Sequence, residues 1–350
     1  MSGNKTMLRI NKLIAYPLIS ALLLAGTQAQ ADLVVLQYHH VDDSTPPATS
    51  TSRSLFEAQM NMIRDLDLDV VPLEAGTRAA LAGEHPDTNE VAITFDDAYE
   101  SVHTFAAPVL DRLGLPYTVF VNTDAVGAKG YMTWEQLRTM ADNELSTIAN
   151  HSTDHAHLAR RRGEPEEAWE NRITSSLDEA QQELKNRLGV EEPLFAYPYG
   201  EFDQALEQKL SERGWLGYGQ QSGAIGQYSG KTRLPRFPMA NAYGQLGSLK
   251  DKLMSKAFPV PAKDLPDGVF EQNPPRLRFT PTDAISPSRL TCFASGLGRI
   301  NFEVVGDSIE VQAPKAINSR RFRYNCTHPA GNGSFYWLSQ QWLNLDAPED

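Results

Sequence analysis

Two adjacent carboxylates end one apolar stretch of the chain, and two histidines follow another. The first stretch reads VAITFDD and ends with Asp96 and Asp97, and the segment NHSTDH holds His151 and His155. Histidine nitrogens and carboxylate oxygens are common ligands of zinc and similar ions, and a carboxylate held off the metal can act as a general base. These four side chains could together perform metal-assisted hydrolysis.

The two histidines are four residues apart. If the segment is helical, this spacing brings both imidazoles to the same side, where they could bind one metal ion. His157 breaks the spacing. Because a solvent-exposed histidine pair would leave the same pattern, the combination with the two aspartates is what favours a metal site.

Short apolar runs alternate with amphipathic helices from residue 32 to about 258. This alternation predicts a parallel sheet with helices outside it, either a barrel or a doubly wound sheet. Capping boxes that begin at Ser54 and Thr133 predict two helices, and Gly189 should end a third. The predicted strands are Leu33–Tyr38, Val91–Phe95, Tyr117–Asn122, Leu145–Ala149, Leu194–Tyr197 and Leu234–Pro238.

Residues with useful chemistry directly follow four of these strands. His39 follows the first strand, Asp96 and Asp97 the second, and His151 and Tyr199 two later ones. In parallel α/β sheets and barrels the strands all exit on one side, and functional sites are built there. The order of the chain therefore predicts a single site that draws on separate strands.

The motifs TFDDA, HSTDH and FAYPYG resemble those of the polysaccharide deacetylases, carbohydrate esterase family 4 with its NodB homology domain. The resemblance covers roughly residues 32 to 240. It implies a distorted (β/α) barrel that removes acetyl groups from sugar polymers with one divalent metal ion. By position it also implies three metal ligands, a general base and a backbone oxyanion donor, which are Asp97, His151 and His155, then Asp96, then Tyr199.

The leaving amine needs a general acid, and the N-terminal LQYHHV supplies a candidate. This segment is similar to one in the poly-β-1,6-N-acetylglucosamine deacetylase branch, whose rearranged barrel carries the acid histidine on its first strand. The resemblance makes His39 the acid. His40 is the alternative, since it should point the other way if the strand continues, and two structural histidines would leave the same sequence.

The sequence departs from the family pattern in three places. Ala98 replaces the usual glycine after the aspartate pair, and Ala196 stands where many members carry an arginine that orients the base. The residue that holds Asp96 is therefore not identified. No leucine-rich strand ending in histidine lies near the end of the domain. These departures motivate an alternative, a non-catalytic carbohydrate-binding protein on the same scaffold.

The chain is long enough for one large domain and a small one. It has 350 residues with a formal net charge of −12, which argues against nucleic acid and anionic lipid as partners. Residues 1–31 combine a basic start, an apolar core and Ala29-Gln30-Ala31, which predicts a signal peptide and export to the periplasm or beyond. No later apolar run reaches membrane-spanning length.

Three segments follow the signal peptide. We predict a deacetylase domain at 32–258, a proline-rich linker at 259–287 and a small β domain of unknown role at 288–350. In an exported protein Cys292 and Cys326 should form a disulfide, the alternative being two buried free thiols. Trp134 and Tyr197 are weaker candidates for lining a sugar site, and for Trp134 packing is the alternative.

These features predict an exported, metal-dependent hydrolase that converts N-acetyl groups of N-acetylglucosamine-containing polysaccharide to free amine plus acetate. Poly-β-1,6-N-acetylglucosamine is the favoured substrate, with peptidoglycan and chitooligosaccharides as alternatives and O-deacetylation open. Two histidines and one aspartate suit zinc first, and also cobalt, nickel or iron. The oligomeric state is not predicted.

Overall fold

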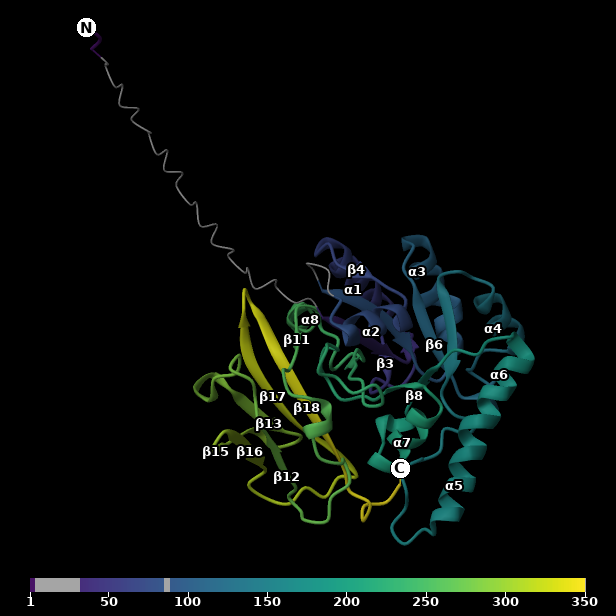
Figure 1. Cartoon of the computed structure of the whole chain (residues 1–350). Helices are drawn as coiled ribbons and strands as arrows, with labels where there is room; N and C mark the ends of the chain where they lie inside the picture. Colours follow the sequence, from purple (N-terminus) through teal and green to yellow (C-terminus); the bar gives the residue numbers. More distant parts are fainter. Residues whose placement is uncertain (4–31, 85–88, 350) are drawn as a thin grey trace.

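The barrel is built on one parallel sheet in the order β10-β1-β5-β6-β7-β8-β9, with β4 also paired to β5 (Figure 1). The computed structural model describes residues 1–3, 32–84 and 89–349, so the predicted signal peptide lies almost wholly outside the described residues. The strands are β1 (Leu33–Tyr38), β4 (Asp69–Val70), β5 (Glu90–Phe95), β6 (Tyr117–Val121), β7 (Ser146–Asn150), β8 (Leu194–Ala196), β9 (Leu216–Tyr218) and β10 (Phe237–Pro238).

One short segment links the two ends of this sheet. Phe237 in β10 pairs with Leu36 in β1, and Leu234 forms a parallel bridge to Tyr218 in β9. The segment 234–238 therefore contacts both edges and brings the sheet close to closure. The predicted class, a distorted (β/α) barrel with additional β structure at the C-terminus, is confirmed.

Helices surround the sheet (Figure 1). A π-helical turn, Ser175–Glu179, joins α5 and α6 into a continuous helix, which Gly189 ends in the left-handed conformation. The capping box predicted at Thr133 is confirmed, whereas α1 is capped by Ser52 and not by Ser54. The helices are α1 (Arg53–Asp65), α2 (Leu73–Ala82), α3 (Ala107–Leu113), α4 (Trp134–Ala141), α5 (Glu166–Thr174), α6 (Ala180–Leu188), α7 (Gln204–Glu212) and α8 (Leu246–Leu253).

The central strands are buried on both faces, as expected where helices cover one face of a parallel sheet and barrel contents fill the other. All six residues of β1 are buried. Val34 and Leu36 belong to the cluster that packs against Phe56 of α1, whereas Leu33 and Val35 belong to a second cluster on the opposite face. This rigid double packing fixes where each strand ends, and so where the site residues emerge.

The C-terminal region forms two further sheets with their own apolar core. β11-β18-β17-β13-β14 and β12-β16-β15 lie beside the barrel in Figure 1. The predicted disulfide is present and joins Cys292 to Cys326, directly opposite residues of β13 and β17. The strands are β11 (Lys256–Ala257), β12 (Arg276–Phe279), β13 (Thr291–Ala294), β14 (Gly298–Ile300), β15 (Phe302–Val305), β16 (Ser308–Gln312), β17 (Arg321–Gly331) and β18 (Ser334–Leu343).

β12 lies inside the stretch 259–287 that the prolines marked as a linker. Its residues Leu277 and Phe279 are buried in the core of the C-terminal sheets. The stretch therefore contributes a strand and core side chains as well as connecting the two regions.

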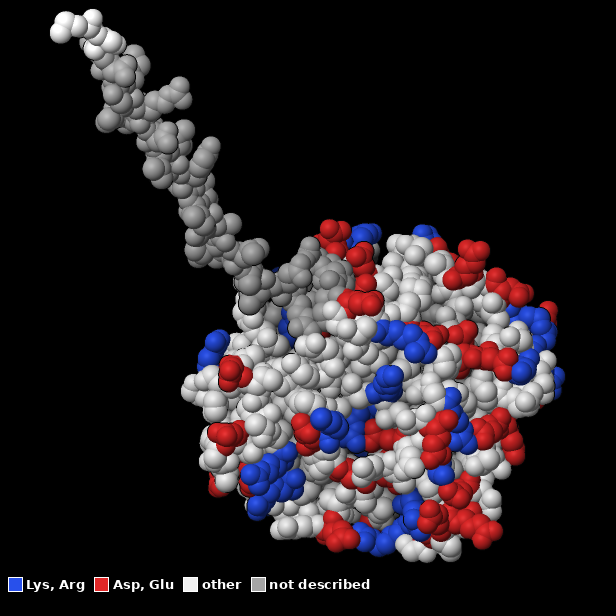
Figure 2. Space-filling view, in the orientation of Figure 1, with Lys and Arg blue, Asp and Glu red and all other residues white. Residues whose placement is uncertain are grey.

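The C-terminal sheets pack directly against the barrel. The Trp337 ring of β18 meets the Phe237 ring of β10 edge-on, with 5.2 Å between centroids. The last residues then run back toward α5 and α7 (Figure 1), where Glu349 pairs with Arg161. On the face shown in Figure 2, acidic and basic side chains are interspersed, so the acidic excess does not gather into one patch there. Among the described residues, no helix combines the length and apolarity needed to cross a membrane.

Candidate active site

Backbone conformation explains how two adjacent aspartates can serve one site. β5 ends at Phe95, and the Asp96 N–H still donates to the Tyr38 carbonyl at 2.9 Å. Asp97 and Ala98 then have φ values of 71° and 54°. This left-handed turn replaces the strand alternation that would send the two carboxylates to opposite faces. Asp96 is fully buried and Asp97 is 7% exposed.

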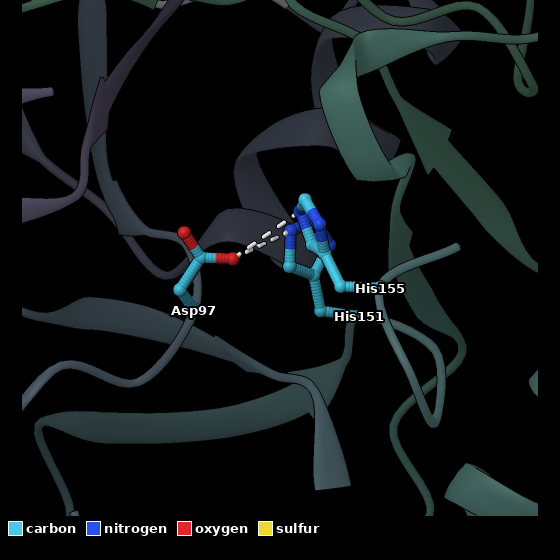
Figure 3. Close-up of side chains that lie close together, drawn as sticks. All are labelled: Asp97, His151 and His155. Carbon is cyan, nitrogen blue, oxygen red and sulfur yellow. Dashed lines mark ion pairs between the residues drawn. The ribbon is translucent and has the colours of Figure 1, made fainter. Parts of the chain in front are cut away.

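Asp97, His151 and His155 converge on one point (Figure 3). The Asp97 Oδ1 atom lies 3.4 Å from Nε2 of each histidine, and the three candidate ligand atoms lie within 4.8 Å of one another. Oδ1 is buried and has no hydrogen-bond partner among the described residues. Two atoms bound to one tetrahedral zinc at about 2.0–2.2 Å lie roughly 3.4 Å apart, so the three residues fit a divalent metal ion.

The histidines reach this point although the segment that carries them is not helical. Residues 151–158 form a non-helical turn in which Ser152 and His155 have φ values of 70° and 53°. The Ser152 hydroxyl accepts from the His155 N–H at 3.0 Å, and Asn150 accepts from the Ser152 N–H at 2.8 Å. A chain of local hydrogen bonds, and not helical periodicity, therefore brings the imidazoles together.

The environment orients the histidines and sets their charges, and Asp97 and Asp96 outweigh the effect of burial and raise the pKa of His151. His151 Nδ1 lies 2.7 Å from the Ala196 carbonyl, an arrangement that directs Nε2 toward Asp97. Burial and the neighbouring His151 lower the pKa of His155 to about 4. The pKa of Asp97 lies well below its usual range, because the nearby histidines outweigh the effect of burial. At neutral pH, His155 is neutral and Asp97 is ionised.

Arg236 holds the second aspartate. Its Nη1 and Nη2 donate to Oδ1 and Oδ2 of Asp96 at 2.7 and 2.8 Å, and Gln37 Nε2 donates to Oδ2 at 2.7 Å. Arg236 is fully buried and also donates to the Gly219 carbonyl at 2.9 Å and to Thr94 Oγ1 at 3.2 Å. Arg236 therefore orients the Asp96 carboxylate, which is the role of the arginine that this chain lacks at position 196.

This contact also sets the charge of Asp96. Burial alone would raise its pKa, but the Arg236 guanidinium and His151 outweigh burial and lower the pKa to about 2. The carboxylate is ionised at neutral pH and is oriented through both oxygens, so it can accept a proton from a water molecule beside it. Sequence reasoning missed Arg236, although an arginine inside the apolar run LPRFP was an available signal.

The two N-terminal histidines differ in position. His39 directly follows β1, is partly buried, and lies close enough to Asp96 and Asp97 that its charge lowers the pKa of both. His40 lies in a short strand, His40–Val41, and its ring stacks on Tyr99 with 3.5 Å between centroids. Asp97 also acts electrostatically on His40, so both histidines lie near this aspartate, and His39 acts on Asp96 as well.

The PYG turn lies on the other side of the metal ligands. Tyr199 and Gly200 are both left-handed, with φ values of 58° and 68°. A Cβ atom at Gly200 would lie 2.6 Å from the Gln220 side chain, so only glycine fits there. The Tyr199 ring lies 4.5 Å from the His155 ring and stacks on His157 at 4.0 Å.

A cavity of about 440 Å³ opens over these groups. Tyr197 does not line it, because this residue is fully buried and its hydroxyl donates to the Thr232 carbonyl at 2.7 Å. Trp134 packs against the barrel core, with the Arg187 guanidinium 5.5 Å from its ring centroid. The residues that line the cavity are Asp97, Tyr99, Asn122, Asp124, Ala125, Tyr131, Thr153, Asp154, His155 and Tyr199.

Comparisons with known proteins agree on one family. A family model described as polysaccharide deacetylase matches residues 83–216. The chain is 25% identical over 211 residues to the Bacillus subtilis protein YxkH, which carries a polysaccharide deacetylase name; the match covers 60% of this chain and 72% of that protein. It is 26% identical over 157 residues to a poly-beta-1,6-N-acetyl-D-glucosamine N-deacetylase of Staphylococcus aureus.

The staphylococcal match covers 43% of this chain and 54% of that enzyme, so the chain spans about half the length of this relative. Among solved structures, IcaB from Ammonifex degensii superposes with a TM-score of 0.54 and 26% identity. That match covers 64% of this chain and 96% of IcaB.

Proposed function

We propose that this chain, which contains a polysaccharide deacetylase domain, is an exported hydrolase that removes N-acetyl groups from N-acetylglucosamine-containing polysaccharide. The products are a free amine on the sugar and acetate. The observation that carries the proposal is the bidentate Arg236–Asp96 contact beside the cluster of Asp97, His151 and His155. The ionised Asp96 carboxylate is available for proton transfer, while the Asp97 carboxylate lies with the two histidines.

Asp97, His151 and His155 would hold a divalent ion, with zinc the first candidate. When bound, such an ion polarises the acetamide carbonyl and lowers the pKa of the attacking water. Asp96 accepts the proton of that water, and Arg236 keeps the carboxylate ionised and oriented. The Tyr199 N–H stabilises the negative charge that develops on the carbonyl oxygen. His39 donates a proton to the sugar nitrogen, so that it leaves as a neutral amine.

Two observations favour poly-β-1,6-N-acetylglucosamine as the substrate. Relatives from Staphylococcus aureus are named as deacetylases of this polymer, and His39, the proposed acid, directly follows the first strand of the barrel. The predicted signal peptide favours export. The alternative of a non-catalytic binding protein loses one of its two motivations, because Arg236 supplies the arginine that position 196 lacks, and the displaced acid histidine is the other.

The test is acetate release from β-1,6-linked N-acetylglucosamine oligomers, with zinc supplied and then chelated. We expect release by the wild type, loss of release on chelation, and loss in Asp96→Asn with metal binding retained. Chitooligosaccharides and peptidoglycan are assayed in parallel, and release from these alone would reassign the substrate. Stoichiometric metal binding without acetate release from any of the three would overturn the enzymatic proposal.

A further inference from the structure

The C-terminal hairpin, formed by the antiparallel strands β17 and β18, contacts the turn that carries Tyr199. Arg320 Nε and Nη2 donate to the two oxygens of Glu201 at 2.8 and 3.0 Å, and Arg321 Nη1 donates to Oε1 at 2.8 Å. Glu201 is fully buried, and His157 Nδ1 lies 2.9 Å from its other oxygen. A buried carboxylate is stable only with such partners, so the start of β17 and the residue after the PYG motif depend on each other.

The second strand of the hairpin holds the preceding residue. Gln341 in β18 donates from Nε2 to the Gly200 carbonyl at 2.6 Å. Arg321 also lies over the Tyr199 ring, with its guanidinium carbon 5.2 Å from the centroid. Side chains from the C-terminal hairpin therefore contact three consecutive residues of the turn, Tyr199, Gly200 and Glu201.

This turn needs support from outside. Tyr199 is a left-handed non-glycine residue followed by a left-handed glycine, a conformation that the chain does not hold by local preference. The Tyr199 ring contacts the ring of the metal-ligand candidate His155. A shift of the turn would therefore move the Tyr199 N–H relative to the metal site.

We infer that Arg320 and Arg321 are positioning residues that hold Glu201, and thereby the Tyr199 N–H, in place for catalysis. The inference rests on the proposed function, in which this N–H binds the developing oxyanion. The small C-terminal β domain then has a definite role, which is to complete the active site of the barrel from outside.

Docking of the two regions does not depend on Arg321 alone. Trp337 packs on Phe237, and Arg161 pairs with Glu349. In Arg321→Gln, Arg320 still bonds both oxygens of Glu201, so the variant should fold, but the contact of Arg321 with the Tyr199 ring and its bond to Glu201 are lost. Arg278→Gln is the matched control, because it removes the same charge from an exposed site on β12, where Arg278 pairs with Glu310 at 3.6 Å.

The first experiment compares kcat, KM, zinc affinity and Tm of the full chain and these variants. Removing an oxyanion donor outright lowers kcat by about 100- to 1000-fold, so a misplaced donor in Arg321→Gln should lower kcat roughly 10-fold or more. KM and zinc affinity should stay within about 2-fold, and Arg321→Lys should recover part of the loss. An unchanged kcat overturns the inference, as does a parallel loss of Tm, zinc affinity and kcat.

A second measurement needs no turnover. Hydrogen exchange of the peptide spanning residues 197–202 should become faster in Arg321→Gln and remain unchanged in Arg278→Gln. Equal exchange in both variants would overturn the inference. A wild type that binds zinc but releases no acetate would instead count against the proposed function, and the exchange result would still decide whether the hairpin holds the turn.

Discussion

The guanidinium of Arg236 lies against both carboxylate oxygens of Asp96, although 140 residues separate the two in the chain. Arg236 belongs to the segment that closes the barrel, and Asp96 directly follows a central strand. The closed sheet brings them together, and their contact leaves Asp96 ionised with both oxygens oriented.

Arg236→Lys should keep a positive charge but lose the two parallel donors. The pKa of Asp96 should rise from about 2, and the acid limb of the kcat/KM profile should move to higher pH. We expect kcat/KM at neutral pH to fall roughly 10- to 100-fold. Arg233→Lys is the control, because Arg233 pairs with Glu207 away from the site. An unmoved acid limb would contradict this account of Asp96.

His155→Ala should remove one of the three proposed metal ligands and weaken zinc binding by more than about 100-fold, with loss of acetate release. His157→Ala should retain zinc, because Nδ1 of His157 bonds to Glu201 and this residue lies outside the ligand cluster. Calorimetric titration with zinc distinguishes the two variants. Equal affinities would show that the cluster in Figure 3 is not the metal site.

His39→Gln should lower kcat by about 100-fold or more with little change in zinc affinity, because proton donation to the leaving amine is lost. His40→Gln should lose much less, since His40 stacks on Tyr99. Steady-state kinetics on one oligomer decides between them. The reverse order of losses would assign the acid to His40.

Glu201 should make the folded protein sensitive to acid. Burial opposes its charge, but His157, Arg320 and Arg321 outweigh burial and lower its pKa from 4.5 to about 2. The unfolded chain takes up the proton near pH 4.5. Stability from this carboxylate is therefore complete above pH 4.5 and is lost as the pH falls toward 2, by about 3 kcal/mol in all.

Urea unfolding of the wild type and Glu201→Gln at pH 7, 4 and 3 tests this linkage. The difference in unfolding free energy between the two proteins should shrink as the pH falls, because the wild-type carboxylate becomes protonated as well. A difference that stays constant with pH would mean that the charge of Glu201 does not contribute.

The local parts of the site were predictable because each motif follows a strand. The resemblance of residues 83–216 to the polysaccharide deacetylases and the barrel class are confirmed, and the structure brings Asp97, His151 and His155 together as the strand order predicts. The backbone conformation of the segment that carries His151 and His155 was not predictable from the spacing of the two histidines. The histidines converge through left-handed residues and short hydrogen bonds, which a four-residue spacing does not reveal.

The long-range parts were not predictable for a different reason. Arg236 reaches Asp96, and Arg320 reaches Glu201, across 140 and 119 residues. Contacts of this kind depend on how the sheet closes and how the C-terminal strands dock. A motif of a few residues carries no information about either. Tyr197 was misplaced for a related reason, since its hydroxyl satisfies a buried carbonyl.

Closure of the barrel by the segment 234–238 has a consequence for the order of assembly. Arg236, the partner of Asp96, belongs to the strand of the barrel sheet that comes last in the chain, so a chain without this strand would have to bury Asp96 without its arginine. Because an unpaired buried carboxylate is strongly disfavoured, the site cannot mature ahead of the scaffold. The Arg236–Asp96 contact therefore forms in the same event that completes the barrel sheet.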